Sequence, residues 1–360
     1  MKDFLTKLKE DKLLFFSFIS LIIISLLAKS PPVFDLKEIE VIFILWSLFV
    51  VVKALELSGV ISHWAALIEK GAYIPLKLVI LTFFLSMFVT NDVALIIIVP
   101  LTLALSAKDV SYIVILEALS ANAGSALTPF GNPQNLFIYW YFDITPIGFI
   151  ITILPFCLFC LLLLAMYSLC IKVDNVEVKK TSITVSNRWI IFFILLILLI
   201  LVVLKLISIY ICFFVLVLVA ILLPSSFRVD YSLLFTFFLF FALANNIKIL
   251  FAKELHHPHH IFLLSIILSQ IISNVPAAIV LSKFTSDWQA LLWGTNIGGF
   301  GIIFGSMANL IAYKFYIKSK KCYSQKLFLK KFHLMSVGAL VFSVMFYFAF
   351  YYLKSFHLYF

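Results

Sequence analysis

Long apolar runs separated by short polar segments dominate this chain of 360 residues. The runs do not alternate between apolar and polar positions, so they differ from the strands of a membrane β-barrel. An α-helix needs about 20 mainly apolar residues to cross a bilayer. On that criterion we expect uninterrupted spans at residues 13–28, 39–57, 146–171, 231–250 and 334–353, and two shorter spans within 189–223 that turn near 205–209.

Four further apolar runs are broken near their middle by polar residues, glycine or proline. Run 75–106 breaks at Thr90-Asn91-Asp92 and run 261–282 at Ser273-Asn274-Val275-Pro276, whereas runs 110–141 and 288–316 break at 122–135 and 295–301. Such backbone is tolerated at membrane depth only where it is buried in protein or lines a wet cavity. Each arm of 75–106 is about 15 residues, too short to cross. We therefore expect 75–106 and 261–282 to be re-entrant hairpins, and the other two runs to be broken spans.

The composition supports a membrane protein, because 64% of the residues are hydrophobic and only 12% are charged. A soluble domain is roughly half apolar and about a quarter charged. The fold class expected is therefore an all-α polytopic membrane protein, whose partner is the lipid bilayer of a plasma or inner membrane.

The net charge of +10 is better explained by membrane topology than by nucleic-acid binding. With a cytoplasmic N-terminus and hairpins that return to the side they left, 19 of the 27 Lys and Arg residues lie inside, 7 lie outside and Lys53 lies in a span. Positive residues gather in cytoplasmic loops. This distribution predicts about nine transmembrane spans plus two re-entrant hairpins.

The two halves of the chain carry similar polar motifs in the same order. Thr90-Asn91-Asp92-Val93-Ala94 is similar to Ser273-Asn274-Val275-Pro276-Ala277, and Asn122-Ala123-Gly124-Ser125 is similar to Asn296-Ile297-Gly298-Gly299. The predicted topology places the first hairpin on the inward side and the second on the outward side. We therefore expect an inverted-topology repeat, an architecture of secondary transporters, with an N-terminal repeat at 1–171, a cytoplasmic linker at 172–188 and a C-terminal repeat at 189–360.

Broken helices offer two kinds of binding group. Their free N–H ends attract anions, and their free C=O ends, with Asn, Ser and Thr oxygens, suit Na⁺. Glycine lets the backbone approach a ligand closely. The candidate substrate-binding and ion-binding residues are Thr90, Asn91, Asp92, Asn122, Gly124, Ser125, Thr128, Asn132, Ser273, Asn274, Thr295, Asn296, Gly298 and Ser306.

Two carboxylates within apolar runs are candidates for a proton relay. A carboxylate deep in a membrane is costly and marks a transport pathway by default. Asp92 either serves that role or caps the second arm of its hairpin. Glu117 either titrates, makes a structural ion pair or faces a water pocket.

Other chemistry is less well supported by the sequence. Lys53 and Glu56 have the spacing of an ion pair on one helix face. The cluster at 256–260 contains four histidines, which either bind a metal or are exposed to solvent. No nucleotide-binding motif is present, so we expect no cofactor beyond a coupling ion.

The stretches 90–103, 122–135 and 273–306 resemble the ion transporter superfamily, which includes arsenite permeases, sodium/proton antiporters, citrate transporters and divalent-anion/sodium symporters. The resemblance covers about 36–316. It implies a scaffold domain and a moving transport domain, commonly in a homodimer with an elevator motion. The symporter branch carries Ser-Asn-Thr at both sites, whereas this chain has Thr90-Asn91-Asp92 and Ser273-Asn274-Val275.

Three functions remain open from the sequence. The first is a secondary active transporter for a small anion, namely a carboxylate, an oxyanion or an arsenite-like solute, coupled to Na⁺ or H⁺ by symport or antiport. The second is a Na⁺/H⁺ antiporter that uses Asp92 and Glu117. The third is a membrane enzyme or a non-transporting subunit; a metal-dependent enzyme would need more than these two acids at membrane depth.

Overall fold

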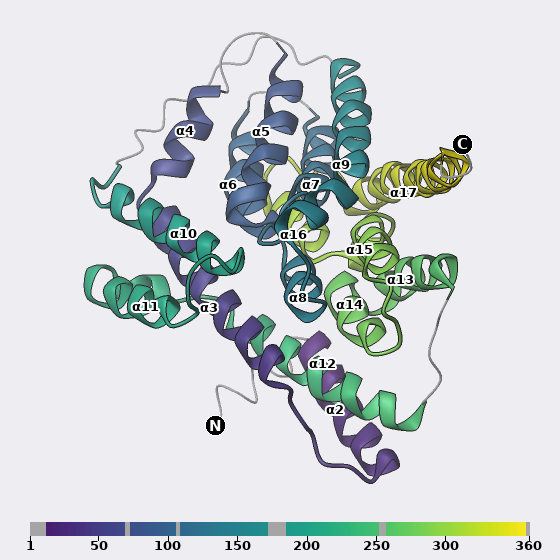
Figure 1. The fold of residues 1–360 in the computed structure, drawn as a ribbon. Coiled ribbons are helices and arrows are strands. Elements are labelled where there is room, and N and C mark those ends of the chain that lie inside the picture. Colours follow the sequence, from purple (N-terminus) through teal and green to yellow (C-terminus); the bar gives the residue numbers. More distant parts are fainter. Residues whose placement is uncertain (1–11, 69–72, 106–108, 172–184, 252–256, 358–360) are drawn as a thin grey trace.

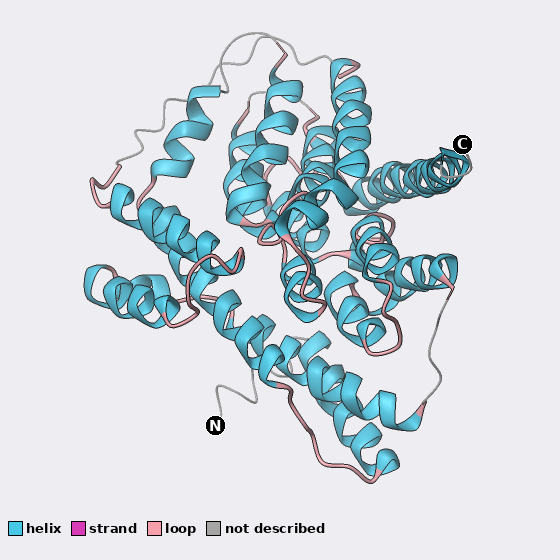
Figure 2. Ribbon diagram, viewed as in Figure 1, coloured by secondary structure: helices cyan, strands magenta, loops and turns pink. Residues whose placement is uncertain are grey.

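The computed structural model describes residues 12–68, 73–105, 109–171, 185–251 and 257–357. Within these ranges every regular element is a helix and no strand is present (Figures 1 and 2). The expected all-helical fold is therefore confirmed.

One set of helices, which we name the α3 group, packs around a single long helix (Figure 1). Helix α3 contacts α10, α11 and α12, and α2 lies along α12. The loop between α10 and α11 falls where the sequence predicted a turn. The members are α2 (Lys12–Ala28), α3 (Leu36–Leu57), α10 (Trp189–Val203), α11 (Ile211–Leu222), the 3₁₀ turn η1 (Pro224–Phe227) and α12 (Tyr231–Leu250).

The remaining helices form a second set, the hairpin group, to which α4 (Val60–Ile68) connects the α3 group. From the first half of the chain come α5 (Ile74–Val89), α6 (Asn91–Ala104), α7 (Ser111–Ser125), α8 (Pro133–Tyr141) and α9 (Pro146–Leu169). From the second half come α13 (Pro258–Ile272), α14 (Asn274–Ser282), α15 (Trp288–Ile297), the 3₁₀ turn η2 (Ile303–Gly305), α16 (Met307–Lys318) and α17 (Gln325–His357). Each of the four expected breaks is a boundary between two of these helices.

The two halves of the chain contact each other crosswise inside the hairpin group. Helix α5 packs on α7 in the first half, and α13 packs on α15 in the second. The helix that follows each hairpin tip packs on its own half and also on the other half, α6 on α16 and α14 on α8. As a result, all four breaks come together in the middle of the molecule (Figure 1).

Only three helices among the described residues are long and apolar enough to cross a membrane unaided: Pro146–Leu169, Tyr231–Leu250 and Gln325–Leu353. Helices α10 and α11 have 15 and 12 residues, fewer than the approximately 20 of a full span. The predicted count of nine spans stays a prediction.

Helix α17 begins earlier than the predicted last span. It starts at Gln325, before the span expected at 334–353, and the Ser324 hydroxyl accepts a hydrogen bond from the Leu327 amide at 3.3 Å. A serine in this position stabilises the start of a helix. The lysines of residues 326–331 therefore lie on the first turns of α17.

A buried ion pair links the two helix groups. Lys283 at the end of α14 is 5% exposed, and its Nζ lies 2.7 Å from Glu38 Oε1 and 3.1 Å from Asp35 Oδ2. Glu38, on α3, is 1% exposed and also accepts a hydrogen bond from the Asn245 side chain of α12. The Lys283 ammonium lies 4.7 Å from the centre of the Tyr141 ring. Two of these charged side chains are therefore well removed from water and depend on each other.

We expect Lys283→Met to destabilise the fold by about 3–5 kcal/mol, because it leaves Glu38 buried without its counter-charge. The double variant Glu38→Gln with Lys283→Met should recover most of this loss, since it removes both charges. Thermal unfolding of the purified protein in detergent measures both. A single variant as stable as the parent would contradict a role for the pair.

Candidate functional site

Both hairpin tips have the same strained backbone. Thr90, between α5 and α6, has φ 76° and ψ 154°, and Ser273, between α13 and α14, has φ 73° and ψ 157°. Residues with a side chain rarely adopt this region, which costs about 1–3 kcal/mol and is found mainly at functional sites. The match between the tips identifies them as equivalent positions.

The helices that follow the other two breaks are capped by side chains. Asn132 Oδ1 accepts the Asn135 amide at 2.9 Å and caps α8. Ser306 Oγ accepts the Ala308 amide at 3.3 Å and caps α16. Thus α8 and α16 begin at defined residues beside the hairpin tips.

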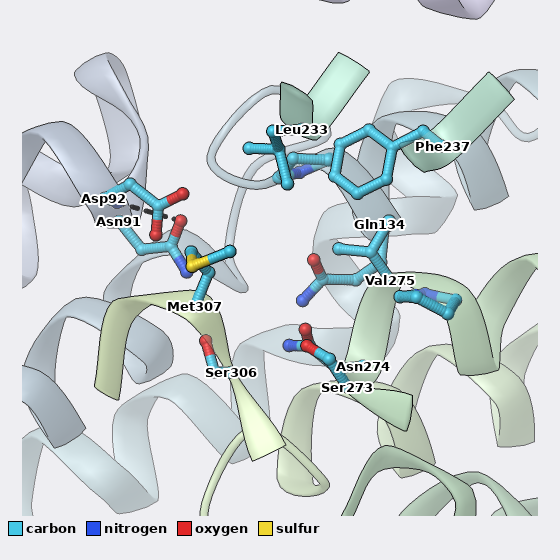
Figure 3. A pocket seen from close by; sticks show the side chains of 12 residues that line it. Asn91, Asp92, Gln134, Leu233, Phe237, Ser273, Asn274, Val275, Ser306 and Met307 are labelled. Carbon is cyan, nitrogen blue, oxygen red and sulfur yellow. Dashed lines mark hydrogen bonds between the residues drawn. The ribbon is translucent and has the colours of Figure 1, made fainter. Parts of the chain in front are cut away.

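One cavity, which we call the central cavity, is bounded by the N-terminal ends of α6, α8, α14 and α16 (Figure 3). Two residues of α12 complete it, so both helix groups contribute. It has about 360 Å³ of space, part of it open to solvent. Its lining residues are Asn91, Asp92, Pro133, Gln134, Leu233, Phe237, Ser273, Asn274, Val275, Pro276, Ser306 and Met307.

Among the described residues, Asp92 is the only charged one that lines the central cavity. Its amide donates to Asn91 Oδ1 at 3.0 Å, which is the dashed line in Figure 3. Its own Oδ1 is buried and has no hydrogen-bond partner among the described residues, and the same is true of Thr90 Oγ1. Two oxygens at the first tip are therefore able to accept a proton or a cation.

Two pairs of asparagines link the halves behind the cavity. Asn122 Nδ2 donates to Asn309 Oδ1 at 2.8 Å, and Asn296 Nδ2 donates to Asn135 Oδ1, also at 2.8 Å. Asn135 in turn donates to the carbonyls of residues 125, 126 and 128, and Asn309 donates to those of 299 and 302. Each of the second-half asparagines, Asn296 and Asn309, lies the same number of residues after its first-half counterpart, Asn122 or Asn135.

These bonds occupy carbonyls at two of the four breaks, between α7 and α8 and between α15 and α16. The last carbonyls of a helix have no partner within the helix, and here Asn135 and Asn309 satisfy carbonyls at and just after the ends of α7 and α15. The N–H ends of the following helices face the cavity instead. Because four helix N-termini border it, the cavity offers N–H groups that suit an anion.

The structure sorts the predicted site residues into three groups. Asn91, Asp92, Ser273, Asn274 and Ser306 line the cavity. Behind it, Asn122 accepts from Asn91 Nδ2 at 3.3 Å and from Ser306 Oγ at 2.8 Å, and Asn132 donates to Asn296 at 3.3 Å and to Ser125 at 3.2 Å.

Thr90 lies at the first hairpin tip, and the remaining predicted residues bond or pack within the helical framework. Thr128 Oγ1 donates to the Met87 carbonyl and Thr295 Oγ1 to the Leu291 carbonyl, each at 2.8 Å. Gly124 and Gly298 lie where helices pack too closely for a side chain. They hold the site in shape without lining it.

Glu117 lies apart from the cavity. It is fully buried on α7 and accepts a hydrogen bond from Thr102 Oγ1 of α6. Ten residues of α6 separate Thr102 from Asp92, which is about 15 Å along a helix. The two candidate relay carboxylates are therefore not neighbours.

Several functional positions escaped the sequence reasoning. Gln134, Leu233 and Phe237 line the cavity, and Asn135 and Asn309 tie the halves together. The asparagines carried a signal, because each lies three residues after the residue that caps α8 or α16. Leu233 and Phe237 of α12 carried no such signal in the sequence.

The structure also bears on the Lys53–Glu56 pair and on the histidine cluster. Lys53 Nζ and Glu56 Oε1 are 2.8 Å apart, as the spacing predicted. His256 lies outside the described residues; the rings of His257 and His260 are 4.7 Å apart, and no group of three metal-ligating side chains was found among the described residues.

Broken helices that meet at one polar cavity, in a chain of this hydrophobicity, define a membrane transporter built from discontinuous helices. The chain belongs to the citrate transporter family, whose profile matches residues 12–294. It is a multi-pass membrane transporter and not an enzyme, and the superfamily resemblance is confirmed.

Three relatives agree with this assignment. The uncharacterized transporter MJ0456 of Methanocaldococcus jannaschii is 34% identical over 84% of this chain and 89% of its own length. The inner membrane protein YbiR of Escherichia coli is 32% identical over 75% of this chain and 78% of its own. The silicon efflux transporter LSI3 of Oryza sativa subsp. japonica is 30% identical over 33% of this chain and 26% of its own.

Gly124→Ala should destabilise the hairpin group by about 1–3 kcal/mol, the usual cost of overpacking. A β-carbon there would lie 2.1 Å from the Phe83 carbonyl oxygen and 2.6 Å from Ser86 Oγ. Gly338→Ala is the matched control, because a β-carbon at Gly338 meets nothing within 4 Å. Thermal unfolding compares the two variants, and an equal effect of both would contradict close packing at Gly124.

Proposed function

We propose that the chain is a secondary active transporter that moves a small anion across the membrane, coupled to Na⁺ or H⁺. The observation that carries the proposal is the meeting of four helix N-termini at the central cavity. Each N-terminus has the effect of about half a positive charge. Together they offer an anion roughly two positive charges without any basic side chain.

The coupling follows from the position of Asp92. An ionised carboxylate in the first turn of α6 cancels part of the positive potential of the N-termini. A proton or Na⁺ bound at Asp92 removes that cancellation, and the cavity then attracts an anion more strongly. Thr90 Oγ1 is a further oxygen for Na⁺ at the same tip.

The lining favours a solute of low charge. No Lys, Arg or His in the described part of the chain lines the cavity, and Leu233, Phe237, Val275 and Met307 make part of its wall apolar. A citrate ion carries three carboxylates, and four helix ends offset only part of that charge. A small oxyanion or a hydroxyl-rich oxoacid fits these groups better, which agrees with a relative named a silicon efflux transporter.

We further propose nine spans, two re-entrant hairpins, an inverted-topology repeat and a cytoplasmic N-terminus. The distribution of Lys and Arg along the sequence supports this topology. The division into an α3 group and a hairpin group supports an elevator motion of the hairpin group, and a homodimer would anchor the α3 group. The repeats are 1–171 and 189–360, joined by 172–188.

A Na⁺/H⁺ antiporter is the second candidate. The unpartnered oxygens of Asp92 and Thr90 favour it, because they suit a cation. The burial of Glu117 against Thr102, away from the tip, weighs against a relay through both acids.

Uptake into liposomes that contain a pH-sensitive dye tests the function. We expect an inward Na⁺ or H⁺ gradient to drive uptake of arsenite, silicate or sulfate, measured by the solute itself, with less uptake of succinate and least of citrate. Proton efflux on Na⁺ addition alone would support the antiporter. Uptake of citrate above all other solutes would contradict the low-charge cavity.

Asp92→Asn separates the two candidates. Removal of one charge next to the solute should raise solute affinity at low cation concentration by at least about tenfold, and uptake should lose its dependence on the cation gradient. Under the antiporter, the variant should abolish all exchange, and Glu117→Gln should do the same. Solute uptake that is abolished in Asp92→Asn, with the fold intact by thermal unfolding, would contradict the anion proposal.

A further inference from the structure

A second cavity lies at the ends of α7, α16 and α17 that are remote from the central cavity. It has about 520 Å³ of space, part of it open to solvent. Its polar lining includes Asp109, Ser111, Tyr316, Lys321, Ser324 and Lys331. We call it the basic cavity, and neither the family nor the proposed transport function accounts for it.

The segment that supplies one wall of the basic cavity is strongly positive. The chain has no Asp or Glu after Asp287, whereas residues 314–331 contain seven lysines. The one carboxylate in the lining is Asp109, which comes from the segment before α7. The wall that the second half of the chain supplies therefore carries only positive charge.

Lys331 is held in a fixed position at this wall. Its Nζ donates to Asp109 Oδ2 at 2.6 Å and to Ser111 Oγ at 3.0 Å, and it lies 4.2 Å from the centre of the Tyr112 ring. Burial alone would raise the pKa of Asp109, but hydrogen bonds from Lys331 and Ser111 hold that pKa below its usual range. Asp109 thus stays ionised and keeps the ammonium oriented.

An apolar stripe runs along α17 directly from the basic cavity. Leu327 lines the cavity and is 43% exposed; the stripe continues through Leu334 at 75%, Val337 at 42%, Val341 at 47% and Met345 at 62%. Their spacing of three, four or seven places them on one helix face. From Leu334 to Met345 the stripe covers about 17 Å, close to one leaflet of a hydrocarbon core of about 30 Å.

We propose that the basic cavity binds the phosphate headgroup of an anionic phospholipid, with an acyl chain lying along the α17 stripe. The cavity alone would suit any phosphate. The α17 stripe favours a lipid over a soluble phosphate compound, because it joins the headgroup site to an exposed apolar surface about as long as one leaflet. Basic pockets between membrane helices on the cytoplasmic side are known to take such headgroups, and the proposed topology places this end of α17 in the cytoplasm.

The test uses the full chain with Val341→Trp, reconstituted in bilayers that contain phosphatidylglycerol or phosphatidylcholine with brominated acyl chains. Bromine quenches an indole that it contacts, so the quenching beyond that of the parent reports which lipid lies on the stripe. We expect a preference for phosphatidylglycerol of about fivefold or more. Equal quenching by the two lipids would overturn the proposal.

The headgroup site is tested by Lys321→Gln with Lys331→Gln in the same background, which should reduce the preference to near onefold. The matched control is Lys314→Gln with Lys326→Gln, which removes two exposed charges of the same segment that do not line the cavity. If the first variant fails to fold, adding Asp109→Asn removes the carboxylate left without its partner.

Inorganic phosphate distinguishes a soluble ligand from a lipid. Phosphate at millimolar concentration should leave the preference unchanged. Loss of the preference in phosphate would indicate a site for a soluble phosphate compound and would overturn the assignment to lipid, as would an equal effect of the control pair.

Discussion

The central cavity depends on how the protein satisfies backbone groups where its helices break. In a membrane, an unpaired N–H or C=O costs several kcal/mol. The side-chain amides of Asn135 and Asn309 take up carbonyls after α7 and α15, and each is oriented by an asparagine of the opposite half. With the carbonyls occupied, the electrostatic character of the cavity is set by the N–H ends of the helices that follow.

Under the proposed function, the same arrangement gives one carboxylate, Asp92, a large effect on anion binding. A cavity lined by Lys or Arg would hold an anion whether or not a cation were present. Here the attraction comes from helix ends, which are weak and fixed, so a single charge at Asp92 changes it by a large fraction. The strained backbone at Thr90 and Ser273 brings these helix ends close together, and the buried pair of Lys283 with Glu38 connects the site to α3.

Much of this arrangement could be predicted from the sequence. Polar and glycine-rich interruptions are costly in apolar runs, so the sequence predicts the breaks at Thr90 and Ser273 and the helices around them. It does not predict which residues contact each other across the molecule. Which carbonyls Asn135 satisfies, and that Lys283 meets Glu38, depend on contacts between distant segments that no local pattern encodes. The sequence marks Glu117 as a buried carboxylate, but it does not show that Glu117 accepts a hydrogen bond from Thr102 on α6 and does not line the central cavity. Helix α17 starts before the predicted span because Ser324 caps it and Lys326 and Lys330 have exposed positions, which a search for apolar spans does not detect.

The crosswise asparagine pairs also constrain how such a protein can change over evolutionary time. If the two halves descend from one duplicated ancestor, most of their positions were free to diverge once they were joined. Asn122 and Asn296 were not free to diverge, because each donates a hydrogen bond to an asparagine of the other half. A change in either one leaves the side-chain amide of its partner without that hydrogen bond. Divergence is therefore expected to concentrate at the lining, where Asp92 has no acidic counterpart, while the amide framework stays common to both halves.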